Sequence, residues 1–312
     1  MKKISNGVNK LIVILGATAS GKTELAIKLA KRFNGEVVSA DSRQIYKGMN
    51  IGSGKVTKKE MAGIPHHLLS VANPKRKFTV AQYQKLAMRA IKDIQKKKKI
   101  PFLVGGAGFY IQSIVDGIII PEVKPDWKLR KKLEKKSNEE LFLMLEKLDP
   151  KRAKSIDKHN PRRLIRALEI VLKTKKPVPS LYGVRPGSDP GLTPSYAILQ
   201  IGINKPRKKL KKIIHKRLIK RLKKNAMIYE VKKLHASGLS FKRLEEFGLE
   251  YRFVAQYLQK KITYQKMINN IQIESEHFVK KQITWFKRDN RIKWIDNFSE
   301  SKKFVDEFLN NV

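Results

Sequence analysis

The sequence predicts an α/β fold, a parallel β-sheet with helices on both faces, because short apolar runs alternate with segments of helical periodicity. An apolar run at 11–15 leads through a glycine-bearing loop to "TELAIKLAKRF", where apolar residues recur at helical spacing. Next, "GEVVSAD" predicts a second buried strand ending in Asp41, and "IPFLVGGAGFYIQSIV" predicts a third strand, a glycine turn and a helix. Strands separated by helices in this order pair in parallel.

The apolar strand pattern stops near residue 122, which divides the chain into three predicted parts. Residues 1–121 are expected to form the first part of the core. A sequence rich in charged residues with helical periodicity predicts a helical insertion over 122–181. Residues 182–312 are expected to return to the core through "YAILQIGIN", near 196–203, which we interpret as the last strand of the sheet, followed by a basic helical region. Before that strand, "KKPVPSLYGVRPGSDPGLTPS" is rich in Pro and Gly and predicts an exposed loop.

The charge of the chain is strongly unbalanced. Among 312 residues there are 69 Lys and Arg against 27 Asp and Glu, a formal net charge of +42. Such a field favours a polyanionic partner, and RNA, DNA and an anionic membrane are the candidates. A host whose proteins are generally rich in lysine would give the same excess, so the charge alone leaves both explanations open.

The chain contains no cysteine, which excludes disulfides, thiolate catalysis and cysteine-ligated zinc. The longest apolar runs, "LIVILGA" and "GIIIP", are far too short to span a bilayer, and the first residues are lysines and polar residues rather than an apolar export segment. We therefore expect a soluble cytoplasmic protein that does not bind a membrane.

The glycine-bearing loop has the G-x-x-x-x-G-K-[ST] spacing of a phosphate-binding loop (P-loop). Its members are Gly16, Ala17, Thr18, Ala19, Ser20, Gly21, Lys22 and Thr23. The two glycines let backbone N–H groups converge on phosphate oxygens at a helix N-terminus, Lys22 adds a positive charge, and Thr23 offers a hydroxyl to Mg²⁺. The loop therefore predicts a P-loop NTPase-like core that binds phosphates, without saying what is done with them.

A second acid that nucleotide-hydrolysing P-loop proteins usually carry is missing. They hold Mg²⁺ with an acidic residue at the end of an apolar strand. Here the candidate strand, "IPFLVGGAG", ends in two glycines, which counts against ATP hydrolysis. The remaining carboxylate is Asp41, at a strand end where ligands gather. Its position alone is equally compatible with a turn cap for "SRQIY".

The text around this loop resembles the motif series of tRNA dimethylallyltransferases, enzymes that prenylate an adenosine beside the anticodon. The resemblance covers about residues 10 to 295, and "DSRQIYKGMNIGS" joined to the P-loop is specific to it. The matching segments, in order, are "GATASGKTELAIKLA", "VVSADSRQIYKGMNIGSGK", "GIPHHLL", "FTVAQYQ", "LVGGAGFYIQSIVDG", "NPRRLIRALEI" and "KKQITWFKR".

The resemblance implies a reaction in which no phosphoryl group is transferred. Dimethylallyl diphosphate would give its allylic carbon to N6 of the adenosine 3′-adjacent to the anticodon, with pyrophosphate as the leaving group. Backbone amides, Lys22 and a Mg²⁺ cofactor at Thr23 would stabilise the departing pyrophosphate. Asp41 would accept the proton of the attacking amine. The adenosine must leave the base stack to reach this site.

The resemblance also assigns further residues, position by position. Asp41, Ser42, Arg43 and Gln44 match the segment that contacts the target adenosine. Arg162, Arg163, Leu164, Ile165 and Arg166 match a second tRNA-contacting segment. Arg217 matches an arginine that helps to bind the diphosphate and takes part in catalysis. Gln282 and Trp285 fall in a late helical motif, with Gln282 assigned to tRNA binding, and Ala107 and Arg252 fall at positions that contact RNA in the family.

Several of these assignments have structural alternatives. The helix that carries Arg162 has core-spaced apolar residues, so its arginines could be a solvated face, and Trp285 is more typical of a core residue than of a base-stacking platform. The run 205–224, in which twelve of twenty residues are Lys or Arg, could be an ordinary surface helix as well as a phosphate-backbone contact. We interpret the adjacent His66 and His67 as structural.

The chain departs from the family pattern at a few positions. Asn50 stands where an aspartate is usual, and Ala107 replaces a hydroxyl residue that can contact RNA, which puts that contact in doubt. In "EFGLEYRFVAQYL" the family's glycine and arginine are present as Gly248 and Arg252 with altered spacing, so recognition of the anticodon stem is expected to differ in detail.

Two other functions remain as alternatives to tRNA prenylation by a monomer that clamps an anticodon stem-loop. An adenylate prenyltransferase would act on free AMP, ADP or ATP, although a mononucleotide does not need the long basic region. A small-molecule kinase or nucleotide-gated RNA-binding protein would place ATP or GTP in the P-loop. RNA-stimulated ATP hydrolysis would identify that last class.

Overall fold

The computed structural model describes residues 9–118, 120–121, 123–179 and 196–310. The chain divides into two compact units: unit 1 is Met1–Val115 with Pro190–Val312, and unit 2 is Asp116–Asp189. The helical insertion therefore begins at Asp116, a few residues before the position expected from the sequence. Most of the Pro- and Gly-rich segment lies outside the described residues. Among the described residues, no helix combines the length and apolar content needed to cross a bilayer.

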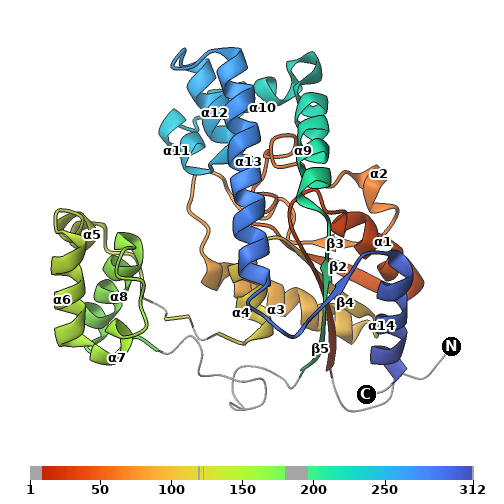
Figure 1. Cartoon of the computed structure of the whole chain (residues 1–312), viewed down its shortest axis with the longest axis horizontal. Helices are drawn as coiled ribbons and strands as arrows, with labels where there is room; N and C mark the ends of the chain where they lie inside the picture. Colours follow the sequence, from red (N-terminus) through yellow and green to blue (C-terminus); the bar gives the residue numbers. More distant parts are fainter. Residues whose placement is uncertain (1–8, 119, 122, 180–195, 311–312) are drawn as a thin grey trace. The chain divides into compact units, whose positions relative to one another are not determined.

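Unit 1 is built on a six-stranded parallel sheet with the strand order β3-β2-β4-β1-β5-β6 (Figure 1). The strands are β1 Asn9–Leu15, β2 Gly35–Ala40, β3 His66–His67, β4 Ile100–Gly105, β5 Tyr196–Ile203 and β6 Ile292–Ile295. β1 is central, with Val13 in register with Leu103 of β4 and Gln200 of β5. The predicted parallel α/β fold is confirmed.

The prediction that 196–203 is the last strand was wrong, because β6 pairs with β5 at that edge of the sheet. β6 has four residues, of which only the first and last are buried, and β3 at the opposite edge has two. Strands this short lack the run of alternating or continuous apolar residues by which a strand is identified from sequence. Both edge strands therefore escaped prediction.

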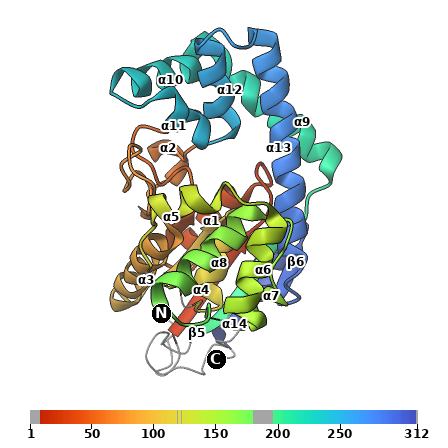
Figure 2. The ribbon, with the colours of Figure 1, turned by 90° about the vertical axis from the view of Figure 1, so that its left-hand side faces the viewer.

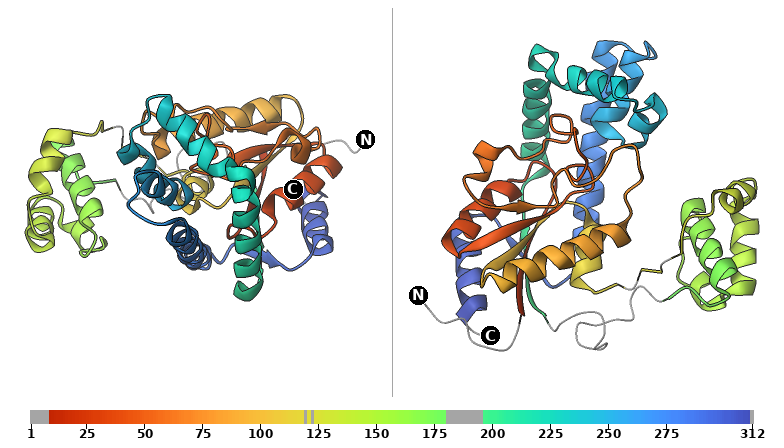
Figure 3. Two further views of the ribbon diagram at one scale, coloured as in Figure 1. Left: turned by 90° about the horizontal axis from the view of Figure 1, so that it is seen from above. Right: turned by 180° about the vertical axis from the view of Figure 1, so that it is seen from behind.

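Helices cover both faces of the sheet because the strand side chains alternate. In β1, Leu11, Val13 and Leu15 belong to the apolar core shared with α3 and α4, whereas Ile12 and Ile14 belong to the core under α1 and α14. The right-hand view of Figure 3 shows α1 and α14 on one side of the strands and α3 on the other. These helices are α1 Lys22–Arg32, α3 Val80–Lys96, α4 Gly108–Val115 and α14 Phe298–Asn310; the short α2 is Lys58–Met61.

A group of C-terminal helices extends unit 1 beyond the sheet. They are α9 Arg207–Leu222, the 3₁₀ turn Lys223–Asn225, α10 Ala226–Ala236, α11 Phe241–Glu246, α12 Leu249–Leu258 and α13 Tyr264–Phe286. Despite its many lysines, α9 buries one stripe at every fourth residue from Leu210 to Leu222, which packs it on unit 1. α9 and α13 contact each other, and Figures 1 and 2 show α10, α11 and α12 grouped at the end of α9 and the start of α13.

Unit 2 is entirely helical within its described residues: α5 Trp127–Leu133, α6 Asn138–Leu148, α7 Pro150–Ala153 and α8 Pro161–Thr174. Its core is formed by apolar side chains of all four helices. Asn160 caps α8 by accepting from the backbone N–H of Arg163, and Pro161 occupies the first helical position. These signals explain why this helix was predictable from the sequence.

A buried carboxylate at the start of β2 gives a prediction about stability. The side chain of Glu36 in β2 is 1% exposed and accepts hydrogen bonds from Lys99 Nζ at 2.9 Å, His67 Nε2 at 2.8 Å and Lys97 Nζ at 3.3 Å. Burial by itself raises the pKa of Glu36, but these three hydrogen bonds outweigh it and lower the pKa to about 2. We expect Glu36→Gln to lower the free energy of unfolding by about 2–3 kcal/mol at neutral pH.

The pH dependence of this effect has a definite sign. A carboxylate with a lowered pKa in the folded state contributes stability above its unfolded pKa, and that contribution is lost as the pH falls toward the folded value. The difference between wild type and Glu36→Gln in urea unfolding should therefore shrink between about pH 4.5 and pH 2. Glu24→Gln, at an exposed ion pair on α1, is the control and should change stability by less than about 1 kcal/mol. An equal effect of the two substitutions would contradict the prediction.

Candidate active site

The P-loop joins β1 to α1 with the backbone that its glycines require. Gly16 has φ +148°, and Gly21, which precedes α1, has φ +103°, a conformation that side-chain-bearing residues rarely adopt. No side chain caps the N-terminus of α1. The first backbone N–H groups of this helix are therefore available to an anion, as the spacing of the motif predicts.

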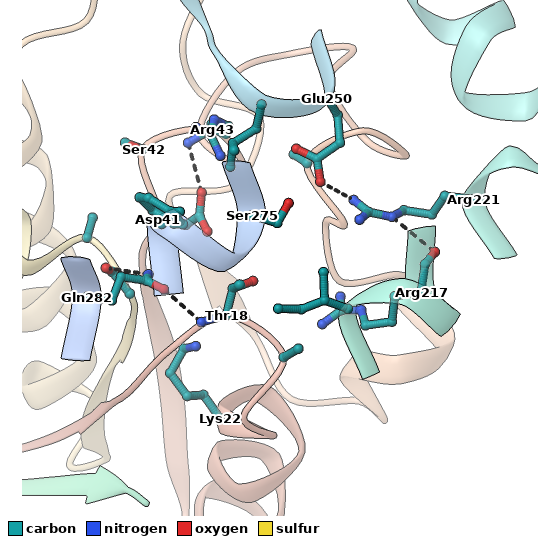
Figure 4. A pocket seen from close by; sticks show the side chains of 17 residues that line it. Thr18, Lys22, Asp41, Ser42, Arg43, Arg217, Arg221, Glu250, Ser275 and Gln282 are labelled. Atoms are coloured by element: carbon teal, nitrogen blue, oxygen red, sulfur yellow. Dashed lines mark hydrogen bonds and ion pairs between the residues drawn. The ribbon is translucent and has the colours of Figure 1, made fainter. Parts of the chain in front are cut away.

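A pocket, which we call the central pocket, lies beside this loop (Figure 4). It is lined by Thr18, Ala19, Lys22, Asp41, Ser42, Arg43, Ser53, Gly106, Ala107, Ile214, Arg217, Arg221, Leu249, Glu250, Ser275, Phe278 and Gln282. The structure thus brings together residues from the P-loop, the ends of β2 and β4, and helices α9, α12 and α13. Of the site residues predicted within unit 1, the lining does not include Gly16, Ala17, Ser20, Gly21, Thr23, Gln44 and Arg252.

Asp41 directly follows β2, and its side chain both caps a turn and faces the pocket, the two roles considered for it from the sequence. Its Oδ1 accepts hydrogen bonds from the backbone N–H of Arg43 at 2.8 Å and of Gln44 at 3.1 Å, which is a turn-capping arrangement. Its Oδ2 makes no hydrogen bond to any residue that the structure describes, and the side chain lines the central pocket. One oxygen is thus used to hold the turn, and the other is left for a ligand.

Lys22 carries a perturbed ammonium group. Its Nζ donates to the carbonyl oxygen of Ala17 at 2.6 Å, within the P-loop itself. Burial lowers the pKa of Lys22 to about 8; the negative charge of Asp41 opposes this shift, and the positive charge of Arg217 adds to it. An anion in the pocket would stabilise the protonated form.

This pKa predicts how the binding of inorganic pyrophosphate depends on pH. The ammonium form attracts the anion, so the affinity of the wild type should fall as the pH rises through about 8, by up to about tenfold per pH unit. Isothermal titration calorimetry at intervals of about 0.5 pH unit between pH 7 and pH 9.5 measures the pyrophosphate affinity. The Lys22→Met variant provides the reference, because pyrophosphate itself titrates in both proteins. A ratio of wild-type to variant affinity that does not change with pH would contradict the prediction.

The end of β4 has no room for a side chain. A Cβ added at Gly105 would come 2.1 Å from the carbonyl oxygen of Ala40, and one at Gly106 would come 2.3 Å from Nε2 of Gln282. At Gly108 the clash is with the ring of Trp285, at 2.4 Å. The absence of a strand-end carboxylate thus has a packing reason, and the described residues contain no cluster of three or more His, Cys, Asp or Glu that could hold a metal ion.

The side-chain amide of Gln282 makes hydrogen bonds to two backbone segments of the site. Its Oε1 accepts from the backbone N–H of Thr18, and its Nε2 donates to the carbonyl oxygen of Gly106, both at 2.8 Å. The side chain is buried and connects the P-loop to the turn between β4 and α4. In this structure Gln282 therefore connects two backbone segments at the central pocket, and its contact with tRNA stays a prediction. The interpretation of Trp285 as a packing residue agrees with its place against the core.

The "DSRQ" segment contacts the altered "GLEYR" segment. Nε of Arg43 donates to the carbonyl oxygen of Phe247 at 3.0 Å, and its guanidinium lies 5.4 Å from the ring centroid of Phe278. A Cβ added at Gly248 would lie 3.6 Å from Arg43 and 3.9 Å from Arg252. Arg252, although outside the pocket lining, is therefore close to the residues predicted to contact adenosine.

Four cationic side chains line the central pocket, Lys22, Arg43, Arg217 and Arg221, and of these Arg221 was not predicted. Arg217 and Arg221 lie one turn apart on α9, and both line the pocket with Lys22. Burial lowers the pKa of Arg217, and the charge of Arg221 lowers it further. Arg221 pairs with Glu250 at 2.9 Å. The spacing of four between the arginines is a signal that could have identified Arg221, whereas Glu250, Ser275 and Phe278 reach the pocket only through helix packing.

The tRNA-contacting segment predicted at 162–166 belongs to unit 2 and divides by exposure. Arg162 and Arg163 are exposed. Leu164 and Ile165 are buried in the unit's core, so the structure gives their side chains a packing role, and contact of this segment with tRNA stays a prediction. Arg166 donates to Glu169 and to the carbonyl oxygen of Val123 and is thus engaged within the unit.

Comparison with known proteins gives a consistent result. The model of the family described as "IPP transferase" matches residues 44–289. The chain belongs to the IPP transferase family. A tRNA dimethylallyltransferase of Carboxydothermus hydrogenoformans is 42% identical over 302 residues, which cover 96% of this chain and 95% of that protein. One of Acetivibrio thermocellus is 38% identical over 304 residues and covers 96% of each.

Solved structures of this family have the same fold. The full-length tRNA isopentenylpyrophosphate transferase of Bacillus halodurans superposes with a TM-score of 0.71 at 33% identity, covering 97% of both chains. A eukaryotic dimethylallyltransferase described as acting on tRNA gives a TM-score of 0.79 at 25% identity, covering 97% of this chain and 80% of that one. The resemblance found in the sequence is confirmed at the level of family and fold.

Proposed function

We propose that this protein transfers the dimethylallyl group of dimethylallyl diphosphate to N6 of the adenosine 3′-adjacent to the anticodon in tRNA. Membership of the IPP transferase family and the activity of the tRNA dimethylallyltransferases that it is similar to support this reaction. The observation that carries it is the composition of the central pocket. It combines a P-loop lysine with Asp41 and arginines, and the end of β4 leaves no space for the second acid of a nucleotide hydrolase.

In the proposed reaction the C1–O bond of dimethylallyl diphosphate breaks as the bond between N6 and C1 forms. Negative charge accumulates on the departing pyrophosphate, where the P-loop backbone, Lys22 and Arg217 would stabilise it more than in the ground state. The N6 proton would pass to the unpartnered Oδ2 of Asp41. The lone pair of N6 is delocalised into the ring, so proton removal during attack assists the bond formation.

We also propose that Mg²⁺ assists, held by Thr23 and by oxygens of the diphosphate. Thr23 is exposed at the first turn of α1, and its hydroxyl makes no hydrogen bond within the described structure, so a hard oxygen ligand is available there. When bound, the ion would neutralise charge on the pyrophosphate. Mg²⁺ characteristically binds through few protein ligands and substrate phosphates, and the residues that the structure describes offer no cluster of three or more acidic or histidine ligands.

A positively charged surface for tRNA is proposed in unit 1 along α9 and at Arg43, and the exposed Arg162 and Arg163 are proposed as separate tRNA contacts of unit 2. A surface that contacts phosphates releases counterions, so tRNA affinity should fall steeply with salt, by about 10³-fold between 50 and 200 mM for six contacts. Filter binding or fluorescence anisotropy across this range measures the slope. A flat response would assign the charge excess to the composition of the host's proteins. Action as a monomer in the cytoplasm stays a prediction.

The reaction itself is tested by supplying dimethylallyl diphosphate and Mg²⁺ with unmodified tRNA, AMP or ATP in separate reactions. Nucleosides released from the tRNA are then analysed by mass for N6-dimethylallyladenosine. The expected result is prenylated product only in the reaction that contains tRNA as the acceptor. Product with a free adenylate alone would change the acceptor, and ATP hydrolysis stimulated by RNA without prenylation would overturn the proposal.

A further inference from the structure

A buried carboxylate on α10 holds a loop of the N-terminal half of the chain by its backbone. Glu230 is 8% exposed, and its two oxygens accept hydrogen bonds from three successive backbone N–H groups. The donors are Asn50 at 2.8 Å, Ile51 at 2.6 Å and Gly52 at 2.9 Å. We call residues 50–53 the anchored loop. Because only backbone atoms are contacted, this arrangement does not depend on the asparagine at position 50.

Tyr251 of α12 completes the arrangement. Its hydroxyl donates to Glu230 at 2.9 Å and accepts from the backbone N–H of Ser53 at 3.1 Å. Burial and the charge of Glu230 raise the pKa of Tyr251 well above its usual value, so the hydroxyl keeps its proton. A Cβ added at Gly52 would lie 2.7 Å from the tyrosine ring, so the loop approaches α12 as closely as only glycine allows.

The anchored loop in turn holds an arginine at the central pocket. The carbonyl oxygen of Gly52 accepts from Nη1 of Arg221 at 2.7 Å, and the same nitrogen pairs with Glu250. Nε of Arg221 donates to the carbonyl oxygen of Arg217 at 3.3 Å. Nη2 donates to no residue that the structure describes, so two N–H groups of a fixed guanidinium remain for an oxyanion (Figure 4).

We propose that Arg221 is a further contact to the diphosphate and that Glu230 is its positioning residue, acting through the anchored loop. This inference rests on the proposed function for the identity of the anion. Removing the carboxylate of Glu230 would leave several buried N–H donors without an acceptor, and the loop would be expected to move. The carbonyl oxygen of Gly52 would then no longer fix the guanidinium. A diphosphate would lose one oriented cation without any change to the P-loop.

The test measures inorganic pyrophosphate binding by calorimetry and dimethylallyl transfer in parallel. Glu230→Gln should weaken pyrophosphate binding about tenfold, and Tyr251→Phe about threefold, with the KM for tRNA unchanged. Exposed residues of the same type supply controls: Tyr229→Phe on α10, 68% exposed, and Glu307→Gln on the distant helix α14 should both bind like wild type. Circular dichroism and thermal unfolding show whether each variant is folded. If Glu230→Gln does not fold, the pyrophosphate affinity of Tyr251→Phe tests the inference.

A double-mutant cycle separates positioning from a general loss of structure. If Glu230 acts through Arg221, the variant carrying both Arg221→Ala and Glu230→Gln should bind pyrophosphate within about twofold of Arg221→Ala alone. Additive losses, or wild-type affinity in both Glu230→Gln and Tyr251→Phe, would overturn the inference while leaving the proposed function intact. A wild-type protein that neither binds pyrophosphate nor prenylates tRNA would overturn both.

Discussion

Replacing Asp41 with alanine is expected to lower kcat for tRNA prenylation by about 10²- to 10⁴-fold, the contribution typical of a well-placed general base. The expectation rests on the different contacts of its two carboxylate oxygens. Oδ1 accepts hydrogen bonds from two backbone N–H groups, whereas Oδ2 has no hydrogen-bond partner among the described residues, and the side chain lines the central pocket. Single-turnover kinetics with saturating dimethylallyl diphosphate and tRNA measure the chemical step directly.

Asparagine at the same position distinguishes the two functions of this side chain. The amide oxygen of Asp41→Asn can still accept from Arg43 and Gln44, so the turn is retained, but the group cannot take a proton at neutral pH. Asp93→Asn, at a half-exposed ion pair on α3, is the control. If Asp41→Asn retained nearly full activity while Asp41→Ala lost it, Asp41 would be a turn cap only, and the base would have to be sought elsewhere in the pocket.

Much of the fold could be predicted because its central elements carry strong local signals. β1, β2 and β4 are continuous buried runs, and α8 begins with Asn160 and Pro161, a cap and a first-turn residue. The edge strands β3 and β6 were missed because they are two and four residues long and exist only through pairing with a longer neighbour. The local sequence of these two strands gives no signal of that pairing.

The residues of the site also differ in whether a local sequence signal identifies them. The P-loop and Asp41 could be identified from residue types at fixed spacing, since a strand end and the loop after it form one local unit. The resemblance added Arg217, which lines the pocket, and Gln282, whose amide bonds two backbone segments. Glu230 and Glu250 could not be identified, because their contacts join α10 and α12 to segments about 180 and 30 residues earlier in the chain.

Substitution of Lys22 by methionine is expected to lower kcat/KM for dimethylallyl diphosphate by about 10²- to 10³-fold, as for the loss of one preorganised group that stabilises developing charge. Methionine keeps the apolar stem of the side chain and removes only the ammonium group, which now lies 2.6 Å from the carbonyl oxygen of Ala17. Affinity for tRNA should not change, because this group is buried within the P-loop rather than on the basic surface of α9. Lys28→Met, at an exposed site on the same helix, is the matched control.

The division of the Lys22 effect between kcat and KM is the more informative result. Charge on the pyrophosphate grows as the C1–O bond breaks, so a cation beside the leaving oxygens should contribute more in the transition state than in the ground state. The loss is then expected mainly in kcat. A rise in KM with unchanged kcat would mean that Lys22 binds substrate and transition state equally. In that case the stabilisation of the departing pyrophosphate would have to come from the backbone N–H groups at the start of α1 and from Arg217 and Arg221 of α9.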